Sequence, residues 1–206
     1  YQVSIDMPAG PSELMIVADA TANATFVASD LLSQAEHGPD SQVLLVSTDR
    51  GLIERVDAQL KEQISVLERH EIARNALKNS KIIYFDDEEQ ALAFTNFYGA
   101  EHLIICLKNE NEFVNQIKHA GSVFIGNYTP ESAGDYASGT NHTLPTNGYV
   151  RQYSGVNLDS FLKSITYQKI TAEGLRNLGP VIEEMANAEG LQAHKNAVSL
   201  RLKTLD

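Results

Sequence analysis

The feature that most constrains the fold is an alternation of short apolar runs with helical patterns. Five runs are rich in aliphatic and β-branched side chains: ELMIVAD, QVLLVST, KIIYFD, HLIICL and GSVFIGN. Amphipathic patterns of helical period lie at residues 22–37, 50–63, 87–97 and 111–119. Apolar strands that alternate with helices are typical of a parallel sheet buried on both faces. The pattern therefore predicts an α/β fold with a largely parallel sheet.

The two ends of the chain depart from this pattern. The first residues, YQVSIDMPAGPSE, start without a methionine and in a strand-like alternation, which indicates a piece of a longer protein. After Val156, the segment NLDSFLKSI, a helix capped by Thr171 and the segment AEGLQAHKNAVSLRLKTL predict a helical tail over residues 156–206. These helices are too narrow to form a core of their own, so we expect them to pack on another surface.

Residues 127–153 separate the sheet from the tail and are rich in Gly, Ser, Thr, Asn and Pro. This composition predicts a long loop, either ordered or mobile. Loops of this length in compact domains are usually functional or disordered.

Composition argues against several classes of function. The 206 residues carry a formal net charge of -11, which argues against binding to nucleic acid or to an anionic membrane surface. No apolar stretch approaches the roughly 20 residues that cross a bilayer. The single cysteine, Cys106, lies in an apolar run and is expected to be a reduced core residue, which fits the cytoplasm.

Polar residues with metal-binding or acid–base chemistry interrupt the apolar patterns at four places. Gln34 and His37 end the first predicted helix, where Gly38 in a left-handed conformation and Pro39 would stop it. In one interpretation, both side chains bind a ligand or a metal from the same face of the helix. In the other, Gln34 is solvated and His37 interacts with the negative end of the helix dipole.

The other three places also allow two interpretations. Asp135 and His142 lie in the Gly-rich loop, Glu101 and His102 at the start of a strand, and Glu189 and His194 near the start of the last helix. Each pair is either functional or an ordinary turn, strand end or solvated face. Glu101 and His102 together could divide proton transfers, because an imidazole titrates near neutrality and a buried carboxyl has a raised pKa.

Six segments are similar to a known family when they are taken together. They are PAGPSE, LLSQAEHGPDSQV, AEHL, GDYASGTNHTLPT, EGL and AHKNAV, in this order from Ser12 to His194. They resemble the signature segments of histidinol dehydrogenase, the zinc enzyme that catalyses the last step of histidine biosynthesis. The resemblance covers nearly the whole chain and concerns the second half of the enzyme.

The resemblance implies a ligand set and a reaction. The metal ligands would be Gln34, His37, Asp135 and His194, a set that suits zinc or a similar borderline divalent ion. The implied reaction oxidises L-histidinol to L-histidine with two molecules of NAD, through a bound histidinaldehyde. All four metal ligands would also bind the substrate, together with the two catalytic residues and with Ser12, His142 and Glu189.

The two catalytic residues would have separate tasks. His102 would take the alcohol proton, and Glu101 would activate the water for the second oxidation. Zinc would mainly orient the substrate.

The resemblance also implies an architecture. The sheet would be an incomplete Rossmann-like parallel sheet, with residues 1–13 as the terminal strand of a missing cofactor-binding domain. Residues 14–155 would form the catalytic α/β half, and the tail over residues 156–206 would cross to the partner of a homodimer. No G-x-G-x-x-G motif follows a predicted strand, so we expect NAD to bind mainly outside this chain.

Two other functions are compatible with the residues. One is a non-catalytic module that binds a metal or an imidazole without the cofactor domain. The other is an α/β scaffold that merely retains these residues.

Overall fold

The computed structural model describes residues 7–205, and its sheet has five parallel strands in the order β3-β2-β1-β4-β5. The strands are β1 (Glu13–Ala18), β2 (Gln42–Ser47), β3 (Lys81–Tyr84), β4 (His102–Cys106) and β5 (Ser122–Ile125). Each strand lies in one of the five apolar runs. The predicted strands and the predicted α/β class are therefore confirmed.

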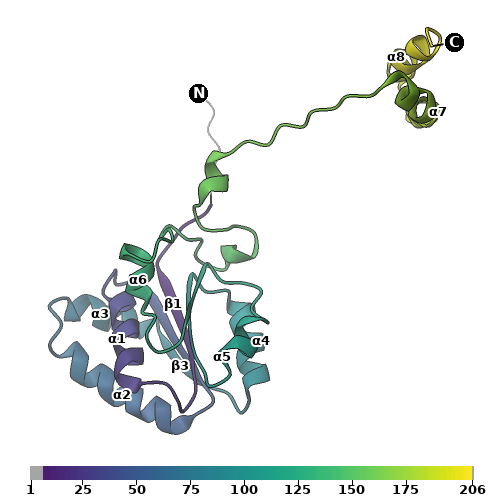
Figure 1. Ribbon diagram of the computed structural model, residues 1–206. Coiled ribbons are helices and arrows are strands. Elements are labelled where there is room, and N and C mark those ends of the chain that lie inside the picture. The colour runs from purple at the N-terminus through teal and green to yellow at the C-terminus, as the bar shows by residue number, and fades with distance from the viewer. Residues whose placement is uncertain (1–6, 206) are drawn as a thin grey trace. The chain divides into compact units, whose positions relative to one another are not determined.

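Helices cover both faces of this sheet (Figure 1). On one face, Leu14 and Ile16 of β1 pack in a core with α1 (Ala24–Ala35), α2 (Arg50–Ile64) and α3 (His70–Lys78). On the other face, Met15 and Val17 pack in a second core with α4 (Glu88–Tyr98) and α5 (Glu110–Val114). Because successive strand residues point to opposite faces, burial on both sides explains why the strands are continuously apolar.

The first helix ends differently from the prediction. The side chain of Asn23 caps its start, and α1 stops at Ala35, so Gln34 lies in the last turn and His37 just beyond it. Among the described residues, Gly38 is not one of the glycines with positive φ. The chain turns instead through a hydrogen bond from Ser41 N–H to Gly38 C=O at 3.1 Å, so the predicted left-handed Gly38 is wrong.

Two other helices differ from their predicted ranges. The predicted helix over residues 111–119 stops at Val114, because the side chain of Asn96 bonds the C=O of Gln116 and the N–H of Lys118 and holds that segment open. Helix α3 was not among the predicted ranges. It forms because Ala73 and Ala76 are fully buried and pack in the core beside the sheet.

The predicted loop over residues 127–153 is not entirely irregular. It contains the short helix α6 (Glu131–Tyr136) and the 3₁₀ turn η1 (Tyr149–Arg151). Helix α6 packs against α1, and this contact brings the loop to the end of α1 at which Gln34 and His37 lie.

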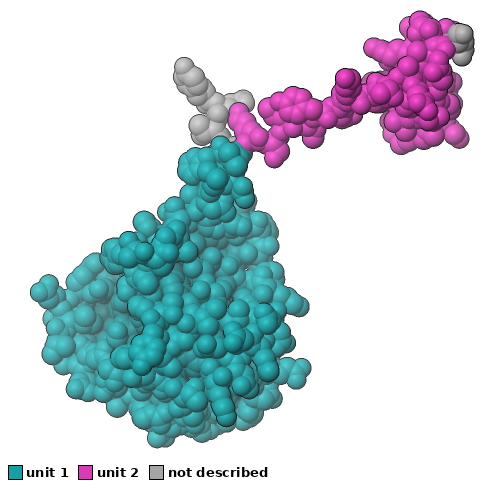
Figure 2. All heavy atoms as spheres, viewed as in Figure 1, with its two compact units in different colours: residues 1–162 teal, residues 163–206 magenta. Residues whose placement is uncertain are grey.

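The chain divides into two compact units, residues 1–162 and 163–206 (Figure 2). The first unit includes the 3₁₀ turn η2 (Leu158–Phe161), where a longer helix was predicted, and the second contains α7 (Ala172–Ala188) and α8 (Gln192–Leu202). The tail predicted from residue 156 thus becomes a separate unit at residue 163. Of the strand predicted at residues 1–13, residues 1–6 lie outside the described residues, residues 7–12 form no strand, and Glu13 belongs to β1.

The predicted helix cap at Thr171 is confirmed, since its hydroxyl oxygen accepts a hydrogen bond from Gly174 N–H at 3.0 Å. The last predicted helix, however, is divided at Gly190, whose φ is 72°. Glu189 therefore lies at the C-terminal cap of α7, not near the start of the last helix, whereas His194 does lie in the first turns of α8. Within residues 7–205, no helix combines the length and the apolar character that a membrane crossing requires.

Candidate functional site

Seven of the nine sequence-predicted site residues line one cavity of about 240 Å³ in the first unit. The cavity lies at the amino ends of the central strands: Ser12 precedes β1, and His102 begins β4. Its lining residues are Ser12, Gln34, His37, Glu101, His102, Asp135, Tyr136 and His142. Segments that are far apart in the sequence therefore meet at one site.

One residue that sequence reasoning missed, Glu13, holds both predicted acid–base residues through its backbone. Its N–H donates to Glu101 Oε2 at 2.8 Å, and its C=O lies 3.1 Å from His102 Nδ1. Both side chains are buried, with 5% and 4% exposure. The first residue of β1 thus fixes the orientation of a carboxylate and an imidazole on the neighbouring strand end.

The contact with Glu13 also selects the tautomer of the neutral His102 side chain. Since a carbonyl oxygen only accepts hydrogen bonds, Nδ1 carries the proton, and the neutral imidazole presents an unprotonated Nε2. This Nε2 is buried and has no hydrogen-bond partner among the described residues. It lies 3.9 Å from Asp135 Oδ1. The free nitrogen is therefore placed to accept a proton inside the cavity.

The electrostatic surroundings of His102 favour its charged form. Burial lowers the pKa of His102, but the Glu101 carboxylate and the negative charge of Glu131 raise it, and the pKa ends above its ordinary value. A proton accepted at Nε2 is therefore stabilised by the neighbouring carboxylates.

Gln34 is another buried group without a hydrogen-bond partner in the described part of the chain. It is fully buried, and neither its amide oxygen nor its amide nitrogen makes a hydrogen bond among residues 7–205. A buried amide without partners costs free energy unless a ligand or an ion satisfies it. Its place in the cavity wall marks the position of a missing polar partner.

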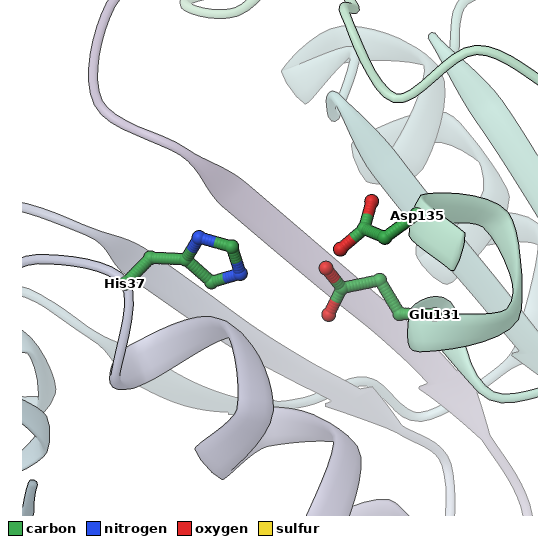
Figure 3. Close-up of side chains that lie close together, drawn as sticks. All are labelled: His37, Glu131 and Asp135. Carbon is green, nitrogen blue, oxygen red and sulfur yellow. The ribbon is translucent and has the colours of Figure 1, made fainter.

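His37 and Asp135 line the same cavity as Gln34 and lie close to each other and to Glu131, which sequence reasoning missed (Figure 3). One ligating atom from each of the three side chains lies within 4.8 Å of the other two. Burial raises the pKa of Glu131 to about 7, and Asp135 raises it as well, although His102 acts in the opposite direction.

These residues fit a divalent metal ion. Zinc binds nitrogen and carboxylate ligands at about 2.0–2.2 Å, so two ligands of one ion lie up to about 4 Å apart. The three side chains need to move little to reach that spacing. The amide oxygen of Gln34, which has no hydrogen-bond partner among the described residues, supplies a further atom that can bind the metal. The set of imidazole, carboxylate and amide donors suits a borderline ion such as Zn²⁺.

Some residues of the candidate site gave only a weak signal in the sequence, and two predicted site residues belong to the other unit. Glu131 follows a proline in a loop-like segment, and Glu13 begins an apolar run, so both look like ordinary surface positions. The one available clue was the spacing of Glu131 and Asp135, which places them on one face of a helix. Glu189 and His194 are exposed residues of the second unit.

The whole chain is similar to one protein family. Residues 1–202 match the family model described as histidinol dehydrogenase. Histidinol dehydrogenase of Bacteroides thetaiotaomicron is 57% identical over 203 residues, which are 98% of this chain and 47% of that protein. The chloroplastic histidinol dehydrogenase of Arabidopsis thaliana is 55% identical over 99% of this chain and 44% of its own length.

A solved structure agrees with the sequence comparisons. The crystal structure of histidinol dehydrogenase from Elizabethkingia anophelis superimposes with a TM-score of 0.97 at 58% identity, over 98% of this chain and 47% of that chain. The chain thus spans slightly less than half the length of these relatives. By sequence and by fold, this chain belongs to the histidinol dehydrogenase family.

Proposed function

We propose that this chain is the second half of an enzyme that oxidises L-histidinol to L-histidine in histidine biosynthesis. The cavity in the first unit is the observation that carries the proposal, because it gathers seven of the nine residues that the family resemblance assigns to the reaction. When bound, Zn²⁺ would orient the substrate and NAD would accept the hydride. We expect NAD to be bound mainly by the other half of the enzyme.

His102 acts as the base for the alcohol. Its unprotonated Nε2 faces the cavity wall formed with Asp135, and its Nδ1 proton is held by Glu13 C=O. It takes the hydroxyl proton of the substrate as the hydride leaves. The Glu101 carboxylate beside it stabilises the protonated imidazole, because it raises the pKa of His102 against the effect of burial.

Glu101 activates the water that attacks the bound aldehyde before the second oxidation. It is buried beside His102, with Oε2 fixed by Glu13 N–H. Ser12 and His142, which also line the cavity, contact the substrate.

Gln34, His37, Asp135 and His194 would hold the metal ion. The first three line the cavity, and His194 lies on α8 in the second unit. We propose that the second unit packs on the partner of a homodimer, so that Glu189 and His194 complete the partner's site. In support, α7 and α8 pack on each other but leave Leu178, Val181 and Met185 exposed, as expected of helices that pack elsewhere. We place the enzyme in the cytoplasm, which suits the single buried Cys106.

The test uses the complete enzyme, with this chain joined to its upstream half. NADH formation is followed separately from L-histidinol and from histidinaldehyde. We expect His102→Gln to lower kcat for the alcohol, and Glu101→Gln to lower kcat for the aldehyde, each by at least about 100-fold. His119→Gln and Glu112→Gln, outside the cavity, are matched controls that keep normal rates.

Normal turnover in both cavity variants would contradict the assigned roles. A complete enzyme that binds zinc but oxidises neither substrate would favour the non-catalytic binding module. Light scattering tests the dimer, and a strictly monomeric enzyme with zinc fully bound would contradict the exchange of the second unit.

A further inference from the structure

Glu131 is a buried carboxylate next to the cavity to which the proposed reaction gives no role. Its side chain is 1% exposed, although it begins a short helix in an otherwise open loop. Charged carboxylates are almost never buried to this degree without a partner of opposite charge or a metal ion. The burial of Glu131 therefore requires an explanation.

Hydrogen bonding does not supply that explanation. Within the described part of the chain, the donor to Glu131 is Ser33, whose Oγ lies 3.2 Å from Glu131 Oε2. The same hydroxyl lies closer to the C=O of Asp30, at 2.8 Å. Because a serine hydroxyl has a single proton, the shorter contact takes most of it. Glu131 is left with a weak share of one donor.

The geometry directs Glu131 toward the metal-binding side chains. Glu131 and Asp135 are four residues apart on α6 and thus share one face of the helix, which packs against α1. Figure 3 shows both carboxylates facing the imidazole of His37, which follows the end of α1. Two carboxylates this close repel each other unless one of them is protonated or a cation lies between them.

A second observation points to a cation at the same place. Gln34 adjoins Ser33 in the chain, is fully buried, lines the cavity, and has both amide atoms without hydrogen-bond partners among residues 7–205. A cation between the carboxylates and the amide oxygen would neutralise the charge of the carboxylates and would give the amide oxygen an interaction partner.

We propose that Glu131 is a further ligand of the metal ion, beside His37 and Asp135. This inference rests on the proposed metal site and adds a residue that the family resemblance did not assign. It also has a consequence that a purely structural role lacks. The carboxylate should destabilise the metal-free chain, through burial and repulsion from Asp135, and stabilise the metal-bound one.

The test measures metal affinity and stability together, on the full 206-residue chain. Zn²⁺ affinity is measured by competition with a chelator, the ligand field by the visible absorption of bound Co²⁺, and stability by thermal unfolding without metal. The variants are Glu131→Gln and Asp135→Asn. The control is Glu36→Gln, which removes the same charge from a partly exposed residue next to His37.

We expect Glu131→Gln to weaken Zn²⁺ binding by at least about 10-fold and to alter the Co²⁺ spectrum. The metal-free variant should unfold at the same temperature as the unsubstituted chain or at a higher one. The control should match the unsubstituted chain in all three measurements.

Two results would overturn the role of Glu131 alone. One is unchanged affinity and Co²⁺ absorption in Glu131→Gln while Asp135→Asn loses binding. The other is a loss in Glu131→Gln of both the stability of the metal-free chain and the affinity for Zn²⁺, which would mean that Glu131 only supports the fold. If the unsubstituted chain binds neither Zn²⁺ nor Co²⁺, the proposed metal site itself is wrong.

Discussion

The two units of this chain differ in what their own residues can organise. The first unit has a sheet with a core on each face, and this frame holds buried polar groups in fixed positions. The second unit has two helices in which the buried residues are only Gly179 and Ala186 within the described range. A core of that size cannot fix a polar site. The first unit therefore forms most of the candidate site in advance, whereas the second can contribute only where it docks.

The largest effect that separates the two units is expected in their cores. Leu45→Ala, at a fully buried position of β2, should lower the free energy of unfolding by about 2–5 kcal/mol, because it leaves a cavity between sheet and helices. Leu200→Ala, at a largely exposed position of α8, should change it by less than about 0.5 kcal/mol. Denaturant unfolding measures both, and equal losses would contradict the comparison.

Metal affinity should show the same contrast. Asp135→Asn removes the charge of a proposed metal ligand in the cavity of the first unit and should weaken Zn²⁺ binding by about 100-fold or more. His194→Ala, in the second unit, should weaken it by about 10-fold, because this ligand must first dock. Competition with a chelator measures both constants. A larger loss in His194→Ala would place the centre of the site in the second unit.

The stability of the metal-free chain should fall as the pH rises. Burial raises the pKa of Glu131 from 4.5 to about 7, so the folded chain keeps a proton that the unfolded chain has released. The loss begins near pH 4.5, is complete above about pH 7, and amounts to at most about 3 kcal/mol. Burial also raises the pKa of Asp30, to about 6, and adds to the loss.

This pH dependence belongs to the first unit and can be assigned by substitution. Denaturant unfolding at pH 5 and pH 8 should show a smaller difference in Glu131→Gln than in the unsubstituted chain. The same difference in both would mean that Glu131 does not cause it.

The smallest effect concerns the second unit alone. Thr171→Ala removes the side-chain cap of α7 and should destabilise that helix by about 1 kcal/mol. Hydrogen exchange should become faster for amides in α7 and stay unchanged in β1 and β4. Faster exchange in the strands would show that the units unfold together.

The sequence predicted the frame of the first unit well, because its strands are continuously apolar and separated by clear helical patterns. Helix α6 was missed, since it is short, contains Gly134 and follows Pro130, and packing against α1 holds it in place. Glu131 was missed with it. No local pattern marks a single glutamate as buried, because its burial follows from the tertiary fold.

The residues of the candidate site were predictable only in part, for a similar reason. Gln34, His102 and Asp135 belong to motifs that the family resemblance identified, and the fold brings them to one cavity. The role of Glu13 depends on backbone groups, which have no sequence signature. Helix α8 with His194 forms near its predicted position, but a motif does not specify what an exposed helix docks on.

A metal site in the first unit is best tested by titrating Zn²⁺ into the metal-free chain. The titration is monitored through the side-chain NMR signals of ¹⁵N-labelled histidines. We expect the imidazole signals of His37 to shift until one equivalent of zinc has been added and then to stay constant, while the signals of His70 and His119, outside the cavity, do not shift. Zinc that leaves His37 unchanged, or that shifts all six histidines gradually without saturation, would contradict a metal site in the first unit.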